Sequence, residues 1–439
     1  MFVNTNLLPI PCIFLDDISG LKHSDGVSSS VTVENQASSE PRLAADLRRP
    51  STHTWVFVSI CVMSFLINYG RVAFAPLVDY FIQSGIAPGV AGLTATAVWF
   101  GSAMLRLPTG WLLTFLRRYQ VLVGVGIALA IGAFFTAGAP GIWLIILGAF
   151  IIGLATGGFF IAANPLVSEI YSQDVGIALG LRGFFSQLAA VAAPFLVGAS
   201  IWLGSWRLGF VALALIVLVV TGILYRAAIR ADIPDAGKDD RDLIGGIKAE
   251  WQLIATGIAL LGFSGFVWQG VFNFYITYLG AEKAISPGLA SVILTIMFAA
   301  GLPSFLIGGR LADRFSALWV LLTILVAFCI SLMAVTFADG LFMIVLLSII
   351  LGFIVHGLFP VGDAYLLGSL PDNHRASAYA GYSAVMMFIH APGSVAVGAL
   401  AQFGVSYSSV FQGFALSLGA MTFLLWYFAL IGRLPGSDR

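Results

Sequence analysis

Twelve long apolar runs make up most of the chain, and they constrain its fold more than any other feature of the sequence. A helix needs about 20 apolar residues to cross a bilayer, because backbone polar groups in lipid must be satisfied within the segment. Only 10% of the 439 residues are charged, against about 25% in an ordinary soluble domain. A soluble fold of this composition would expose large apolar patches. The sequence therefore predicts an all-α integral membrane protein.

The apolar runs fall into two groups of six. We expect membrane-spanning helices over residues 55–81, 90–116, 121–136, 142–171, 176–202 and 208–228, and then over 253–280, 289–309, 318–337, 341–369, 375–402 and 406–431. A hydrophilic linker, residues 229–250, separates two predicted six-helix bundles, 54–228 and 251–433. Residues 1–53 are polar, which predicts a disordered cytoplasmic segment. The alternative is that the start codon has been assigned too far upstream and that this segment does not belong to the protein. Residues 434–439 form a short tail.

The basic residues mark one side of the membrane. Fifteen of the 21 Lys and Arg residues lie at the termini, in the linker or at the ends of even-numbered helices, whereas only Arg207 and Lys283 lie on the opposite side. Cytoplasmic loops carry the excess of Lys and Arg. We therefore expect a multi-pass protein of the plasma membrane with both termini in the cytoplasm. The formal net charge of zero gives no reason to expect a nucleic-acid partner.

The second half of the chain repeats the first at an offset of 199 residues. The residue pairs that match are Gly110 with Gly309, Gly153 with Gly352, Phe160 with Phe359, and Asn164 with Asp363. Two parallel six-helix repeats joined by a linker are typical of secondary transporters.

A short loop motif carries a family resemblance. Residues 309–315, GRLADRF, resemble the loop signature of the major facilitator superfamily, and the first-half copy starting at Gly110 has Thr114 in place of the acid. This resemblance implies that superfamily's fold, twelve transmembrane helices in two pseudo-symmetric six-helix bundles, and a transport function. It also implies that Asp313 contacts the cytoplasmic start of the fifth helix, where a carboxylate is favoured. The predicted gating residues are Gly309, Asp313, Arg314, Arg182, Gly110, Arg117 and Arg118. A simple turn-forming loop is the alternative.

Proline and charge indicate which helices line the transport path, because both are costly in a membrane unless a cavity or a neighbouring helix satisfies them. The third, sixth, ninth and twelfth runs have no proline and no charge before their last turns, which predicts that these helices are outer supports. The predicted substrate-binding residues are Asn68, Arg71, Arg106, Trp268, Gln269, Asn273 and His390. The predicted proton-coupling residues are Asp363 and His356, which lie seven residues apart and therefore on one helix face.

Each of these residues also has a purely structural interpretation. Arg182 can pair with Glu169 or Asp174, and either histidine can be a satisfied interior side chain. Arg71 and Arg106 can pair with acids or with backbone carbonyls. Unpaired arginines in the membrane are costly, however, and a bound anion is a suitable partner because guanidinium binds carboxylate, nitrate or phosphate in a bidentate manner.

Two comparisons within the superfamily bear on the substrate. Residues 105–110, LRLPTG, look like the second-helix segment of nitrate/nitrite porters, in which the arginine binds the anion. The second arginine of those porters is replaced here by Phe305, and their glycine-asparagine signature is missing, so the segment supports only a preference for anions. Residues 189–198 resemble more faintly the glycine-proline motif of drug antiporters.

These observations predict a secondary active transporter, a symporter or antiporter, for a small and anionic solute. The sequence contains no nucleotide-binding signature, nucleophile–base pair or metal-ligand spacing. We therefore expect no enzyme activity, no cofactor and no metal, and a monomer whose partners are the substrate and the lipid bilayer. An efflux pump for amphipathic compounds is one alternative. A non-transporting membrane sensor or scaffold on the same fold is another.

Overall fold

The computed structural model describes residues 51–434 except 114, 172–174, 232–242 and 371–374. The predicted disordered segment and the C-terminal tail lie almost wholly outside these residues. The described helices all belong to one compact unit, residues 41–439. The predicted linker is not entirely irregular, because residues 243–249 form the short helix α9 (Leu243–Ala249).

The described residues contain twelve helical segments that are long and apolar enough to cross a membrane, which confirms the predicted number. In the first half these are α2 (Thr52–Val72) with α3 (Phe74–Gln83), α4 (Pro88–Leu112), α5 (Arg118–Gly138), α6 (Ile142–Ile170), α7 (Val175–Trp202) and α8 (Arg207–Arg230). In the second half they are α10 (Trp251–Gly257) with a π-helix (Ile258–Gly262) and α11 (Phe263–Lys283), α12 (Pro287–Ala299) with α13 (Gly301–Arg314), α14 (Ala317–Phe337), α15 (Leu341–Ser369), α16 (Arg375–His390) with α17 (Gly393–Gln402), and α18 (Tyr407–Leu430). The third span begins at Arg118 and ends at Gly138, so it is longer than the predicted run.

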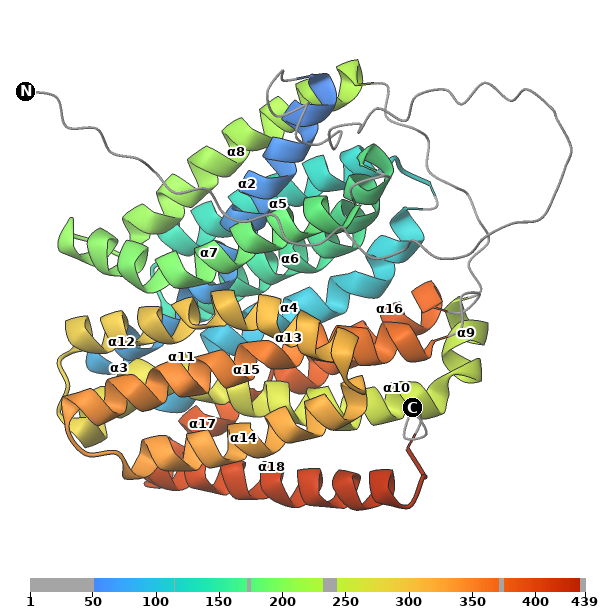
Figure 1. Cartoon of the computed structure of the whole chain (residues 1–439). Helices are drawn as coiled ribbons and strands as arrows, with labels where there is room; N and C mark the ends of the chain where they lie inside the picture. Colours follow the sequence, from blue (N-terminus) through green and yellow to red (C-terminus); the bar gives the residue numbers. More distant parts are fainter. Residues whose placement is uncertain (1–50, 114, 172–174, 232–242, 371–374, 435–439) are drawn as a thin grey trace, which may run out of the picture. The chain divides into compact units, whose positions relative to one another are not determined.

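The helices pack mainly within their own halves. In the first half α6 packs against α4 and α5, and in the second half α15 packs against α13 and α14. Figure 1 shows α14 and α18 side by side at the outer edge of the second half, where they are also in contact. The domain boundaries at 54–228 and 251–433 stay a prediction.

The alternation of helix directions defines two faces. We call the face that contains residue 51, residue 231, residues 243–250 and residue 431 the linker face. The opposite face, formed by the short turns 84–87, 139–141, 203–206, 284–286, 338–340 and 403–406, is called the hairpin face.

The sequence repeat is visible in the helix crossings. A Cβ atom on Gly153 would overlap the backbone oxygen of Val98, and a Cβ atom on Gly352 would overlap the backbone oxygen of Met297. Gly352 lies 199 residues after Gly153, and Met297 lies 199 residues after Val98, which is the offset of the sequence repeat. Glycine lets two membrane helices approach until their backbones touch. The repeat therefore preserves a close helix crossing in each half.

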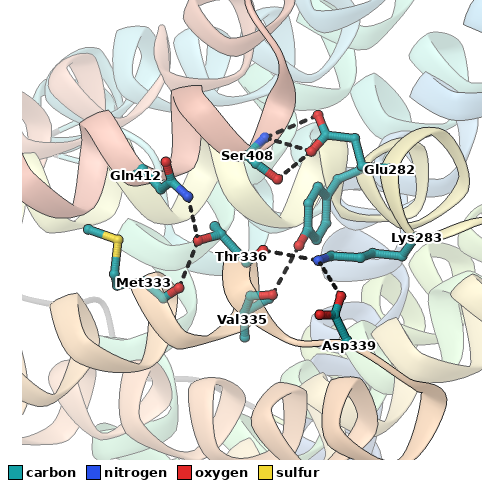
Figure 2. A network of polar contacts seen from close by, with 9 residues as sticks. Glu282, Lys283, Met333, Val335, Thr336, Asp339, Ser408 and Gln412 are labelled. Atoms are coloured by element: carbon teal, nitrogen blue, oxygen red, sulfur yellow. Dashed lines mark hydrogen bonds and ion pairs between the residues drawn. The ribbon is translucent and has the colours of Figure 1, made fainter.

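A polar network fixes the hairpin-face end of the second half (Figure 2). Both carboxylate oxygens of Glu282 accept a hydrogen bond from the Ser408 amide at 3.1 Å, beside the first residues of α18. The Lys283 ammonium donates to the Thr336 carbonyl at 3.0 Å, and the Gln412 amide donates to the Thr336 hydroxyl at 3.0 Å. These bonds join α11, α14 and α18 into one unit.

The two halves meet through glycines near the hairpin face. A Cβ atom on Gly92 of α4 would lie 2.7 Å from the Ser394 carbonyl oxygen of α17, and one on Gly89 would lie 2.8 Å from the Gln402 side chain. The Val395 amide also donates to the Thr96 hydroxyl at 3.2 Å. A further hydrogen bond between the halves joins Arg106 of α4 to Ser383 of α16. The hairpin face is therefore the closed side in this conformation.

Candidate functional site

The first half presents Arg71 on an aromatic platform. Its guanidinium carbon lies 4.3 Å from the centre of the Trp99 ring, a cation–π contact. Its Nη2 donates to the Asn68 side chain, and the Asn68 amide donates to the Ser186 carbonyl of α7, both at 2.5 Å. Asn68, one turn before Arg71, therefore connects that arginine to α7.

Arg182 lies near the same group. The guanidinium carbons of Arg182 and Arg71 lie 5.2 and 5.8 Å from the centre of the Phe160 ring. The Nε and Nη1 atoms of Arg182 are buried and have no hydrogen-bond partner. Glu169 forms an ion pair with Arg118 of α5. The pairing of Arg182 with Glu169 is therefore absent, and Asp174 lies outside the described residues.

Arg106 connects the two halves. Its Nη1 donates to the Ser383 hydroxyl on α16, and it interacts electrostatically with Asp363. The Tyr379 hydroxyl donates to the Asp363 carboxylate at 2.7 Å. Arg106, Ser383, Tyr379 and Asp363 thus form a polar cluster that spans both halves.

The second half has no arginine at the position equivalent to Arg106. Phe305 stands there, and it stacks on Phe359 with ring centres 6.1 Å apart. Its ring also lies 6.2 Å from His356. At the position where nitrate porters have their second arginine, this chain therefore has an aromatic side chain, Phe305, packed against other rings.

His356 is enclosed by rings and hydrogen-bonded to its own helix. Its Nδ1 lies 2.7 Å from the Gly352 carbonyl oxygen, and the Trp268 ring lies 5.6 Å away. Gly301 leaves the space that the imidazole fills, because a Cβ atom there would approach the His356 ring. This geometry favours the interpretation of His356 as a satisfied interior side chain.

His390 contacts an irregular part of the seventh span. Its Nε2 lies 3.0 Å from the Leu261 carbonyl oxygen, inside the π-helix. Short π-helical segments disturb the regular backbone ladder and are frequent at functional sites. His390 also interacts electrostatically with Arg71 and Arg106. It borders a cavity of about 40 Å³ together with Trp268, Tyr382 and Asp363, which is room for about one water molecule.

The two predicted amide residues of the seventh span, Gln269 and Asn273, make hydrogen bonds that hold helices together. The Asn273 amide donates to the Ser394 hydroxyl and to the Gln269 carbonyl, both at 2.8 Å. The Ser394 hydroxyl in turn donates to the Gln269 carbonyl at 3.1 Å. Gln269 and Asn273 are both buried. They join α11 to α17 rather than to the arginine cluster.

The loop-motif residues lie at helix ends near the linker face. Gly309, Asp313 and Arg314 belong to the last turns of α13, Gly110 belongs to the end of α4, and Arg117 precedes α5. Within the described part of the chain, Asp313 makes no hydrogen bond or ion pair. The expected contact between Asp313 and the start of the fifth helix stays a prediction, because residues 172–174 lie outside the described ranges.

Four further residues of this region, Trp99, Phe160, Tyr379 and Ser383, were not among the predicted site residues. A signal was available for three of them. Trp99 precedes Arg106 by seven residues, which places both on one helix face. Ser383 follows Tyr379 by four residues, so α16 carries a polar face that matches the charges across from it. Nothing in the sequence indicated that Phe160 lies beside both arginines.

Twelve membrane-length helices in two repeated halves, with arginines between them, define the class of membrane transporters with a twofold internal repeat. The sequence profile of the Major Facilitator Superfamily matches residues 60–269 and 253–438. The chain belongs to this superfamily. The predicted fold class is thereby confirmed, and the protein is a multi-pass transport protein of the kind that acts on small molecules.

Solved structures with the same fold include three transporters. A bacterial homologue of the human lysosomal transporter Spinster, inward-facing and occupied, matches with a TM-score of 0.70 and 16% identity over 84% of this chain and 96% of its own. The nucleoside transporter NupG matches with a TM-score of 0.69 and 14% identity. The match covers 85% of this chain and 98% of NupG. A partially occluded inward-open structure of the xylose transporter XylE from E. coli matches with a TM-score of 0.66 and 14% identity. The match covers 86% of this chain and 99% of XylE. A search of curated protein sequences finds no match.

Proposed function

We propose that this protein is a secondary active transporter that moves a small anionic solute across the plasma membrane by alternating access. It acts as a monomer with both termini in the cytoplasm. The observation that carries the anionic assignment is a pair of membrane-embedded arginines, Arg71 and Arg182, that have no acidic partner among the described residues.

The energetic argument concerns desolvation. A charged side chain in the membrane interior costs at least about 2.5–3.5 kcal/mol unless it is paired or reaches water. Among the described residues, Arg71 gains only an amide oxygen and ring contacts, and two nitrogen atoms of Arg182 are unsatisfied. A carboxylate or phosphate oxygen supplies the charge-assisted hydrogen bonds that both guanidiniums lack.

The conformation supports access from the linker face. The glycine contacts between α4 and α17 close the hairpin face, whereas Asp363, nearer the linker face, is exposed. With the linker in the cytoplasm, as the distribution of basic residues predicts, this is the inward-facing state. Binding of the solute between the halves then precedes rotation of one half against the other.

Asp363 provides a route for coupling to protons. Its carboxylate attracts Arg106, so it competes with a substrate anion for the same guanidinium. Protonation of Asp363 removes this competitor and leaves Arg106 free for the anion. The anion and the proton therefore bind together, which corresponds to symport. His356 offers weaker support for a coupling role because its Nδ1 is engaged by the backbone.

Replacing either Arg71 or Arg106 with glutamine is expected to reduce anion transport strongly. A charge-assisted hydrogen bond contributes about 1.5–3 kcal/mol, so anion binding weakens by roughly 10- to 150-fold. A thermal-shift screen of the purified protein against organic and inorganic anions identifies a binder, and its uptake into proteoliposomes is then measured for each variant.

The matched control is Arg310→Gln, on the exposed side of α13, which should transport normally. Retained uptake in both Arg71→Gln and Arg106→Gln, with drugs as better substrates, would favour the efflux-pump alternative. Absence of flux for every anion that binds would favour a sensor or scaffold.

Replacing Asp363 with asparagine is expected to separate anion movement from proton movement. The neutral amide resembles the protonated carboxyl group, so anion exchange across the membrane continues while anion-driven proton entry stops. A pH-sensitive dye inside proteoliposomes reports the proton entry. Asp339→Asn, whose side chain is 99% exposed in a hairpin-face turn, is the control and should keep full coupling. Undiminished proton entry in Asp363→Asn would exclude this residue as the coupling site.

A further inference from the structure

The acids in the described part of the membrane spans form no ion pair with Arg71 or Arg182. Glu169 pairs with Arg118, Glu282 accepts from Ser408, and Asp79 accepts from Gln83. Asp313 lies in the last turn of α13. Asp363 remains, and it faces Arg106. In the described part of the spans, the three central arginines therefore face a single acid.

Among the described residues, the site therefore holds two uncompensated positive charges when Asp363 is ionised. Uncompensated charge opposes passage through the closed state, in which both faces exclude water. A solute with one negative charge would neutralise only half of the excess. A solute with two negative charges would neutralise it fully.

The two unpaired guanidiniums are separate centres. Arg71 and Arg182 each lie beside the Phe160 ring, at 5.8 and 5.2 Å from its centre. Arg182 also interacts electrostatically with Cys61, which lies about two turns before Asn68 on α2, whereas Arg71 follows Asn68. The two cations thus interact with positions about two turns apart on α2, with the Phe160 ring beside both.

We infer that the transported solute is an organic dianion whose two negative groups are separated by a short apolar body, as in a dicarboxylate. One carboxylate binds Arg71 with help from Arg106, and the other binds Arg182, while Phe160 and Trp99 contact the carbon chain between them. This inference rests on the proposed anion transport and specifies its substrate class. It also assigns Arg182, predicted as a gating residue, to substrate binding.

The test compares anions of different charge and shape on the purified full-length protein. Binding is measured by thermal shift and by calorimetry at pH 7.5 with succinate, glutarate and adipate as dicarboxylates. Butyrate is the monocarboxylate, nitrate is the compact monoanion, and inorganic phosphate is the compact dianion. At least one dicarboxylate is expected to bind with a Kd tenfold or more below that of butyrate, nitrate and phosphate.

The variant Arg182→Gln makes the test specific. Its affinity for the dicarboxylate should fall by about tenfold or more, to the affinity that the protein has for butyrate, because each lost charge-assisted bond contributes about 1.5–3 kcal/mol. Its affinity for butyrate should stay within about threefold of that of the unmodified protein. Arg182→Lys keeps the charge and should retain most of the dicarboxylate preference. This conservative variant also serves if Arg182→Gln does not fold.

The outcomes separate this inference from the proposed function. Tighter binding of nitrate, phosphate or butyrate than of every dicarboxylate would overturn the dianion assignment and leave anion transport intact. An equal loss of butyrate and dicarboxylate affinity in Arg182→Gln would also overturn it, because Arg182 would then act on the whole site. Failure of all anions to bind would overturn both proposals.

Discussion

Replacing Gly352 with leucine is expected to prevent normal packing of the second half. A Cβ atom at this position already overlaps the backbone oxygen of Met297, and backbone cannot move aside as a flexible side chain can. Overpacking of this kind costs about 1–3 kcal/mol, occasionally more, and here it forces α15 away from α12. The yield of monodisperse protein and its melting temperature should both fall. Gly153→Leu should have the same effect in the first half through Val98.

The controls are Gly124→Leu in α5 and Gly222→Leu in α8, where nothing lies within 4 Å of an added Cβ atom. These two changes should be neutral or slightly stabilising, because leucine favours helix by up to about 1 kcal/mol relative to glycine. Size-exclusion chromatography and thermal unfolding in detergent distinguish the two classes. Normal yield and stability of both Gly352→Leu and Gly153→Leu would contradict the repeated close crossing.

The helices could be predicted because membrane insertion depends on composition over a long window, which a single chain displays directly. Interruptions of helices also had a sequence signal. The breaks at Ala73 and Ala300 each precede a proline, Pro76 or Pro303, by three residues. Proline removes a backbone donor and clashes with the preceding turn. Pro108 and Pro165 nevertheless lie inside continuous helices, so proline alone does not determine where a break occurs.

The candidate site was only partly predictable. Asn68 and Arg71 are three residues apart on one helix, and local spacing was enough to place them together. The contacts of Arg106 with Ser383 and of Arg182 with Phe160 join different helices. Periodicity indicates which residues share a face of one helix, but not which faces of two helices meet. The repeat relates equivalent positions and therefore gave no information about contacts between the halves.

Replacing Gly92 with leucine is expected to open the hairpin face. The nearest atoms to an added Cβ are the Ser394 carbonyl at 2.7 Å and the Phe274 ring at 3.2 Å, both in the other half. The leucine therefore acts as a wedge between the halves and leaves the packing within each half intact. A wedge that disfavours the closed contact by about 1–3 kcal/mol shifts the conformational equilibrium by about 5- to 150-fold. Transport should slow strongly while the melting temperature changes little, in contrast to Gly352→Leu.

Spin labels on the hairpin face measure this shift directly. Ser84→Cys and Phe403→Cys place labels on exposed turn residues of opposite halves, in a background where Cys12, Cys61 and Cys329 are replaced by alanine. Pulsed electron spin resonance should show a longer label-to-label distance becoming dominant in Gly92→Leu. Gly413→Leu on α18, with open space around the added Cβ, should keep the original distance. An unchanged distance distribution in Gly92→Leu would mean that the contact between α4 and α17 does not control the closed side, and the glycine approach would then be only a feature of helix packing.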